Sequence, residues 1–330
     1  MTSYGWRENG CTVTSSKVWG LLLAVLSAAS FGTSGSFAGS LLASGWSPGA
    51  AVTIRIGVAA VVLTVPALIQ LRGRWGLLRR NAAMILLFGV LAVAGAQLFF
   101  FLAVERVPVG VAILLEYAGV LLVVGWLWWQ GQRPGRLTVA GAVVAMAGLV
   151  LVLDLLGAVS LDPIGVLCGL LAAVGLATYF VLSGRVDAQL PPLVLAWAGM
   201  VVAAVVLLLA GLVGILPLRA DTSDVDIAGA QVSWLVPVLG LSVLAAAVAY
   251  VTGIGAVRLL GSRVSSFVGL TEVLFAVLFA WLLLAQEPTA VQAVGGLLVL
   301  AGVALVRADD RVVTPPTPVA VAAPSSGSRC

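Results

Sequence analysis

The sequence predicts an all-α integral membrane protein with ten transmembrane helices in two inverted five-helix repeats. Three observations lead to this fold class: the composition, ten long apolar runs, and residues that recur between the two halves. Of the 330 residues, 62% are hydrophobic and 9% are charged, and the mean hydropathy is +1.18. Soluble domains are about 45–50% apolar and about 25% charged. The composition therefore excludes a water-soluble globular fold and any large soluble domain.

The apolar runs are long enough to cross a bilayer, which requires about 20 residues in a helix. They are separated by short segments rich in charged or turn-forming residues, and we expect each run to form one helix. The ten predicted spans are 18–41, 47–70, 82–104, 107–129, 137–156, 163–184, 191–216, 233–257, 263–285 and 289–306.

The basic residues set the orientation, because Lys and Arg concentrate in cytoplasmic loops. If the N-terminus is cytoplasmic, 14 of the 17 basic residues lie inside, Arg106 and Arg219 lie outside, and Arg55 lies within a span. We therefore expect a multi-pass protein of the cell membrane with both termini in the cytoplasm. The inside residues are Arg7, Lys17, Arg72, Arg74, Arg79, Arg80, Arg133, Arg136, Arg185, Arg258, Arg263, Arg307, Arg311 and Arg329.

Polar or Pro- and Ser-rich tails flank the membrane part of the chain. Residues 1–17 form the predicted N-terminal tail, and residues 307–330, with TPPTP and APSSGS, form a C-terminal tail. Such compositions bury too little apolar surface to fold alone, so we expect both tails to be disordered. The predicted repeats between them are 18–156 and 157–306.

The two halves share residues at matching places. Because each half has five spans, an odd number, the second copy must enter the membrane in the opposite direction. Inverted repeats of this kind are typical of secondary transporters, which bind substrate near the midplane between the halves. The matches are Gly20, Ala28, Thr33 and Gly39 with Gly165, Ala173, Thr178 and Gly184 at one constant offset, then Glu116, Gly141 and Gly148 with Glu272, Gly295 and Gly302.

Two carboxyl groups, Glu116 and Glu272, are expected near the middle of the membrane. Each lies about nine residues from one end of its span, which places it roughly 13 Å deep in a core about 30 Å thick. A charge at that depth persists only where it faces a bundle interior or a wet cavity. Two interpretations stay open: these residues bind substrate or exchange a proton, or they remain protonated and hydrogen-bond a neighbouring helix.

A basic residue, Arg55, lies within the second span and needs a partner there, because it stays charged. It either pairs with Glu116 as a structural ion pair or receives a carboxylate of the substrate. Its repeat counterpart is Gly199, so this feature belongs to one half only. Further polar candidates for the site, which bundle hydrogen bonds could equally satisfy, are Gln97, Tyr117, Tyr179 and Tyr250.

The sequence has few residues of the kinds that usually bind metals, and it lacks the usual ATP-binding motif. The chain has no His, and its three Cys, at positions 11, 168 and 330, are far apart. We therefore expect no metal site, no cofactor and no enzymatic activity, since an intramembrane transferase would need an acid/base or metal constellation at one membrane face. No Walker A sequence occurs, so ATP is not the expected energy source.

A family resemblance rests on residues 271–306, TEVLFAVLFAWLLLAQEPTAVQAVGGLLVLAGVALV. This segment resembles the end of each repeat in EamA-type members of the drug/metabolite transporter superfamily, in which a membrane Glu is followed by a short acidic turn and a Gly-rich helix. Within that family, VPVGVAILLEYAGVL at 107–121 and YFVLSG at 179–184 resemble threonine/homoserine exporters. The superfamily resemblance covers residues 18–306.

The resemblance implies ten helices around a central cavity and export of amino acids or related small metabolites. It places Glu116 and Glu272 at the family's Glu positions and Arg55 at an Arg often found in the second span. The family commonly has Pro after the Glu, whereas this chain has Tyr117 and Val273. Without that Pro, a helix kink beside the cavity is not expected from sequence.

The predicted function is secondary transport by alternating access, with export of small amino acids or related metabolites. The expected partners are a small-molecule substrate, the lipid bilayer and protons as a coupling ion, and no nucleic acid. Export of hydrophobic cations or drugs on the same fold is the alternative. Arg55 opposes it if its side chain faces the cavity, whereas a cavity dominated by Glu116 and aromatic rings would favour it.

Overall fold

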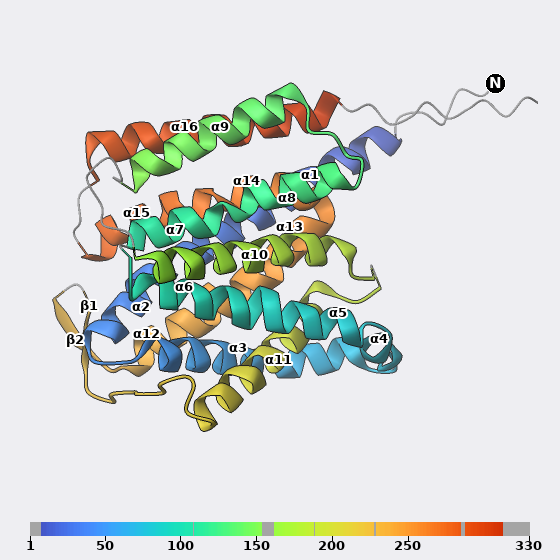
Figure 1. The fold of residues 1–330 in the computed structure, drawn as a ribbon. Helices are drawn as coiled ribbons and strands as arrows, with labels where there is room; N and C mark the ends of the chain where they lie inside the picture. The colour runs from blue at the N-terminus through green and yellow to red at the C-terminus, as the bar shows by residue number, and fades with distance from the viewer. Residues whose placement is uncertain are drawn as a thin grey trace, which may run out of the picture.

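The fold is a bundle of long apolar helices (Figure 1), seen in a computed structural model that describes residues 8–107, 109–153, 162–187, 189–227, 229–284 and 288–312. Within these residues, nine helices are long and apolar enough to cross a membrane, and α9 (Arg136–Val152) is a shorter apolar helix. Together they correspond to the ten predicted spans. The all-α membrane fold class is therefore confirmed.

Five spans come from the first half of the chain, and several of them are interrupted. The first span breaks at Thr33, the third contains a π-helical segment, η1, and the fourth breaks at Ala118. The elements of this half are α1 (Glu8–Gly32), α2 (Ser34–Ala43), α3 (Pro48–Leu71), α4 (Gly76–Arg80), α5 (Ala82–Leu87), η1 (Phe88–Gly95), α6 (Ala96–Val104), α7 (Val109–Tyr117), α8 (Gly119–Trp129) and α9.

The second half repeats the pattern with one difference. Its eighth span also holds a π-helical segment, η2, and its ninth span breaks at Leu270, but its sixth span runs without a break. The elements are α10 (Pro163–Arg185), α11 (Pro192–Leu212), β1 (Val225–Ile227), β2 (Ala230–Val232), α12 (Leu235–Leu239), η2 (Gly240–Val248), α13 (Ala249–Leu260), α14 (Ser262–Gly269), α15 (Thr271–Leu284) and α16 (Ala290–Val312).

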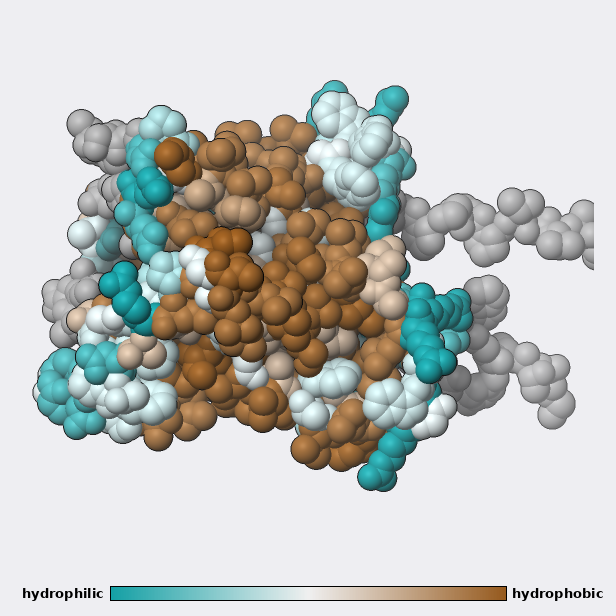
Figure 2. All heavy atoms as spheres, turned by 60° about the horizontal axis from the view of Figure 1, so that its bottom comes forward, coloured by the Kyte–Doolittle hydropathy of each residue, from teal (hydrophilic) through white to brown (hydrophobic). Residues whose placement is uncertain are grey.

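The two ends of the described chain lie on one side of the bundle, and the antiparallel hairpin β1–β2 lies on the opposite side (Figure 1). We call these sides the terminal face and the hairpin face. A hydrophobic surface extends across the middle of the bundle, with hydrophilic residues gathered toward the two faces (Figure 2). This distribution is the one that a membrane requires of the surface it covers.

The hairpin face joins the two halves. The indole Nε1 of Trp46 donates to the Asp221 carbonyl at 2.5 Å, and the Ser47 amide donates to the Arg219 carbonyl at 2.9 Å. The Ser223 backbone N–H, which donates to the Asp221 carboxylate at 2.9 Å, lowers the pKa of that carboxyl group. The linker between the seventh and eighth spans is thereby fixed on the turn between the first two.

Helices α9 and α16 pack with their backbones in contact. A Cβ atom at Gly141 would lie 2.6 Å from the Gly302 carbonyl oxygen, and one at Gly148 would lie 2.7 Å from that of Gly295. The two glycines of α9 therefore face the two glycines of α16 crosswise, each opposite the repeat counterpart of the other, across one antiparallel helix pair (Figure 1). Close approach of this kind is typical of small residues in membrane helices.

Parts of both predicted tails are helical. Helix α1 begins at Glu8 and α16 continues to Val312, so residues 8–17 and 307–312 extend the first and last helices. The expectation of disorder was wrong for these residues, because each segment continues the helix that it adjoins. The rest of each tail, residues 1–7 and 313–330, lies outside the described residues.

Candidate functional site

Both membrane carboxyl groups lie beside a helix break. Helix α7 ends at Tyr117, one residue after Glu116, and α15 begins at Thr271, one residue before Glu272. The Tyr117 hydroxyl donates to the Gly269 carbonyl at 3.3 Å, which links the two broken spans in mid-bundle. The sequence offered no reason to expect these breaks, since neither Glu is followed by Pro.

The seven predicted site residues line one cavity of about 250 Å³ between the repeats. The first, second, third, fourth, sixth, eighth and ninth spans contribute to it, whereas α9, α11 and α16 do not. Three pairs of matching spans, the first and sixth, the third and eighth, and the fourth and ninth, therefore converge on one site, as the inverted repeat predicts, whereas the second span lines it without its counterpart, the seventh. The seven residues are Arg55, Gln97, Glu116, Tyr117, Tyr179, Tyr250 and Glu272.

The Arg55 guanidinium is held by neutral oxygen atoms. Its Nη1 donates to Ser34 Oγ at 3.1 Å and to Gln97 Oε1 at 2.8 Å, and its Nη2 donates to the Ala245 carbonyl at 2.5 Å. The Ala245 carbonyl belongs to η2, so a residue of the first repeat is fixed to a π-helical segment of the second. Segments of this kind occur frequently at functional sites.

The structural ion pair with Glu116, one of the two interpretations of Arg55, does not form in the described part of the chain. Ion pairs there join Arg80 to Asp187 and Arg106 to Asp162. A guanidinium has five N–H donors. Three are used by Ser34, Gln97 and Ala245, so two have no hydrogen-bond partner among the described residues.

Aromatic rings form much of the cavity wall. Tyr250 packs edge-on against Phe31 and Tyr179, with ring centroids 5.2 and 5.4 Å apart, and Phe100 packs edge-on against Phe101 at 5.7 Å. All five rings line the cavity. The site therefore combines one cation and two carboxyl groups with a mostly apolar, aromatic surface, which is the usual make-up of a small-molecule pocket.

Two buried hydroxyl groups of the cavity lack partners. The Tyr179 hydroxyl and Ser265 Oγ have no hydrogen-bond partner among the described residues, although the two side chains are 5% and 3% exposed. Buried polar groups are normally hydrogen-bonded, and one left without a partner needs an explanation. A polar ligand or water in the cavity would satisfy both.

The cavity is closed toward the terminal face and open toward the hairpin face. Its lining residues nearest the terminal face are buried, such as Ala256 at 1% exposure, whereas Gly35 and Gly39 on α2 are exposed. The helix packing shows the same asymmetry: α10 packs on α13 and α14, but α2 has no comparable packing on α6 or α7 within the described residues.

The sequence missed several lining residues. Gly35 and Gly39 have the spacing of close helix packing, but a Cβ atom at either would meet no atom within 4 Å, so they leave the cavity mouth open. Gly165 and Gly169, with the same spacing, do pack closely, against Val107 and Leu115. Helical spacing cannot separate these two uses of glycine, because they differ only in what lies opposite.

A bundle of apolar spans with charged groups in a central cavity defines a multi-pass membrane transporter. The EamA-like transporter family model matches the chain twice, over residues 18–154 and 163–308. The chain belongs to that family, a branch of the drug/metabolite transporter superfamily, and is built from two repeats.

Two further comparisons concern known proteins and solved structures. No match was found among curated proteins. A solved structure described as "Crystal structure of protein" superposes with a TM-score of 0.71 at 20% identity, over 90% of this chain and 99% of that one. At this identity the likeness concerns the fold alone.

Proposed function

We propose that this protein is a secondary active transporter that exports small amino acids or closely related metabolites. The observation that carries the proposal is the cavity, in which Arg55 keeps unused N–H donors while Glu116 and Glu272 supply carboxyl groups. A zwitterionic amino acid carries the complementary charges. A gradient drives transport, since no ATP-binding motif is present.

The α-carboxylate of the substrate binds Arg55, and its ammonium group binds Glu116 or Glu272. Ser34, Gln97 and the Ala245 carbonyl hold the guanidinium in place, so little side-chain freedom is lost when the substrate arrives. A volume of about 250 Å³ limits the substrate to a small molecule. The aromatic rings contact its apolar part.

Glu116 and Glu272 also suit a coupling role. A carboxyl group in a membrane cavity gains and loses a proton according to which face the cavity is open to, and a proton-coupled carrier needs such a group. The paired helix breaks leave one carboxyl group of each repeat beside the substrate. Binding of substrate to one carboxylate and of a proton to the same group are then mutually exclusive.

The orientation of the protein in the membrane determines which transport state the structure represents. The distribution of basic residues along the sequence supports an orientation in the cell membrane with the terminal face toward the cytoplasm. The structure then corresponds to an outward-facing state, because its cavity opens to the hairpin face. In alternating access, the two repeats exchange conformations around the same site, and the cavity opens to the cytoplasm to load the substrate.

Hydrophobic cations are the second candidate substrate. Phe31, Phe100 and Phe101 beside two carboxyl groups favour an aromatic cation. The buried guanidinium of Arg55 in the same cavity opposes it, because like charges repel in a site of low dielectric constant.

The test uses the full chain in inside-out membrane vesicles with an imposed proton gradient, acidic inside. Small amino acids, their amides and cationic dyes are offered in turn. The proposal predicts saturable accumulation of amino acids that an uncoupler abolishes. Accumulation of dyes alone would contradict amino-acid export and indicate drug export instead. Saturable uptake that is independent of the proton gradient would contradict proton coupling.

A further inference from the structure

The closed end of the cavity, at the terminal face, is sealed by contacts between two groups of helices. Helix α1 packs on α13, α14 and α15, whereas α10 packs on α6, α7 and α8. The two groups meet where α10 touches α13 and α14, and where α8 touches α14. There the Ser262 hydroxyl, at the start of α14, donates to the Phe180 carbonyl of α10 at 2.8 Å. Opening the cavity to the terminal face requires these contacts to break.

Arg258 at the end of α13 crosses the same boundary. Its Nη1 donates to the carbonyl of Leu190, a fully buried residue of the turn between α10 and α11. Its Nε and Nη2 are buried without a hydrogen-bond partner among the described residues. A guanidinium left with buried, unused donors needs a compensating negative charge nearby.

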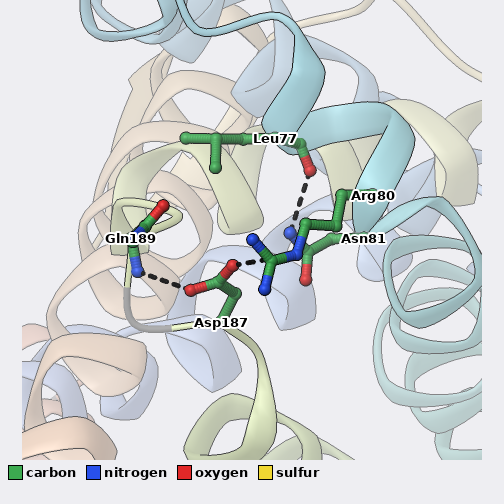
Figure 3. A network of polar contacts seen from close by, with 5 residues as sticks. All are labelled: Leu77, Arg80, Asn81, Asp187 and Gln189. Carbon is green, nitrogen blue, oxygen red and sulfur yellow. Dashed lines mark hydrogen bonds and ion pairs between the residues drawn. The ribbon is translucent and has the colours of Figure 1, made fainter.

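Asp187 brings a negative charge into the same turn: the Leu190 backbone N–H donates to the Asp187 carbonyl at 2.9 Å, so this carboxylate lies within one turn of the residue that binds Arg258. The Asp187 Oδ1 accepts a hydrogen bond from the backbone N–H of Gln189 at 3.0 Å, and its Oδ2 lies 3.6 Å from Nε of Arg80 (Figure 3). The Asp187 side chain is 17% exposed and that of Arg80 is 71% exposed. Arg80 is the last residue of α4, and the next span, α5, continues directly into η1. Because η1 packs on α10, this span belongs to the α10 group. The Arg80–Asp187 pair therefore lies within one group, whereas Arg258 belongs to the other.

We propose that Arg258 holds the cavity closed at the terminal face by binding the Leu190 carbonyl and the Asp187 carboxylate. We call the contacts between the two helix groups the gate, Arg258 its latch, and the two acceptor groups the receiver. The inference rests on the alternating access of the proposed function. In the outward-facing state Arg258 ties α13 to the α10–α11 turn. When the cavity opens to the terminal face, Arg258 leaves, and Asp187 stays with Arg80 and Gln189. Arg80 holds the Asp187 carboxylate in position but belongs to the same helix group as Asp187, so this ion pair does not have to break.

The test measures how often the cavity opens to the terminal face. Ala256, which is 1% exposed at the closed end of the cavity, is replaced by Cys in a chain whose Cys11, Cys168 and Cys330 have been changed to Ser or Ala. A membrane-impermeant maleimide is added on the terminal side. A Lys17→Cys variant, whose side chain is exposed near that face, identifies the vesicles that present it.

The labelling rate at position 256 is proportional to the population that is open to the terminal face. Arg258→Gln should raise it about tenfold, the effect of losing one charge-assisted hydrogen bond. Asp187→Asn should raise it by a smaller factor, because the Leu190 carbonyl remains. The matched control is Arg106→Gln, which removes an arginine paired with Asp162 at 3.3 Å on the opposite face and should leave the rate unchanged.

An unchanged labelling rate at position 256 in Arg258→Gln, or an equal rise in Arg106→Gln, would contradict the proposed role of Arg258. If Arg258→Gln does not fold, Ser262→Ala removes a second bond across the gate without a change of charge and should raise the rate about threefold. Labelling needs no substrate. A failure of amino-acid transport with a normal gate response would therefore remove the proposed substrate and leave the latch in place.

Discussion

Replacing Arg55 by Lys separates charge from geometry in the cavity. Lys keeps the positive charge, but its single ammonium group cannot bond Ser34, Gln97 and the Ala245 carbonyl and still offer a donor to a substrate. Losing one hydrogen bond to a charged group costs about 1.5–3 kcal/mol. At about 1.4 kcal/mol per factor of ten, the apparent affinity for a carboxylate substrate should fall about 10- to 100-fold.

The assay compares the amino acid with its amide, which lacks the carboxylate, as competitors for uptake into proteoliposomes. In the wild type the acid should compete far better than the amide, and in Arg55→Lys this preference should disappear. Arg106→Lys, which changes a 44% exposed arginine, is the control and should keep the preference. Equal losses for acid and amide would refute substrate recognition by Arg55 and leave it a structural role.

Three other changes test separate parts of the site. Glu116→Gln should abolish proton movement driven by the amino acid while counterflow continues; proton release recorded with a pH dye in that variant would exclude Glu116 as the coupling group. Gly39→Leu should fill the open cavity mouth and remove most transport at an unchanged Tm, because its Cβ meets no atom within 4 Å; normal transport would mean that the mouth lies elsewhere. Gly148→Val should lower stability by about 2 kcal/mol, since its Cβ would lie 2.7 Å from the Gly295 carbonyl oxygen, whereas Gly57→Ala faces open space and should leave Tm unchanged.

Much of the fold follows from the sequence because a membrane imposes simple rules. Apolar length sets the spans, and the odd number of spans in each half sets the inversion. Glu116 and Glu272 could be placed in mid-membrane by counting residues, and the structure brings both into one cavity with Arg55. These predictions depend on position along a helix, which sequence records directly.

What the sequence does not reveal depends on contacts between distant residues. The breaks beside Glu116 and Glu272 arise without Pro, and the Gly269 carbonyl at one of them is bonded by Tyr117, 152 residues earlier in the chain. The hydrogen bond from Arg258 to the Leu190 carbonyl likewise joins residues that are 68 positions apart. The π-helical segments, one of which supplies the Ala245 carbonyl to Arg55, left no pattern that apolar periodicity could distinguish from an ordinary span.

The most direct measurement is an experimental structure with a transported amino acid bound. The ligand should be the one that competes best in the uptake assay. The account predicts that its carboxylate lies within hydrogen-bonding distance of Arg55 and its ammonium group beside Glu116 or Glu272, inside the same cavity. An amino acid bound outside that cavity, or within it with no contact to Arg55, would contradict the account.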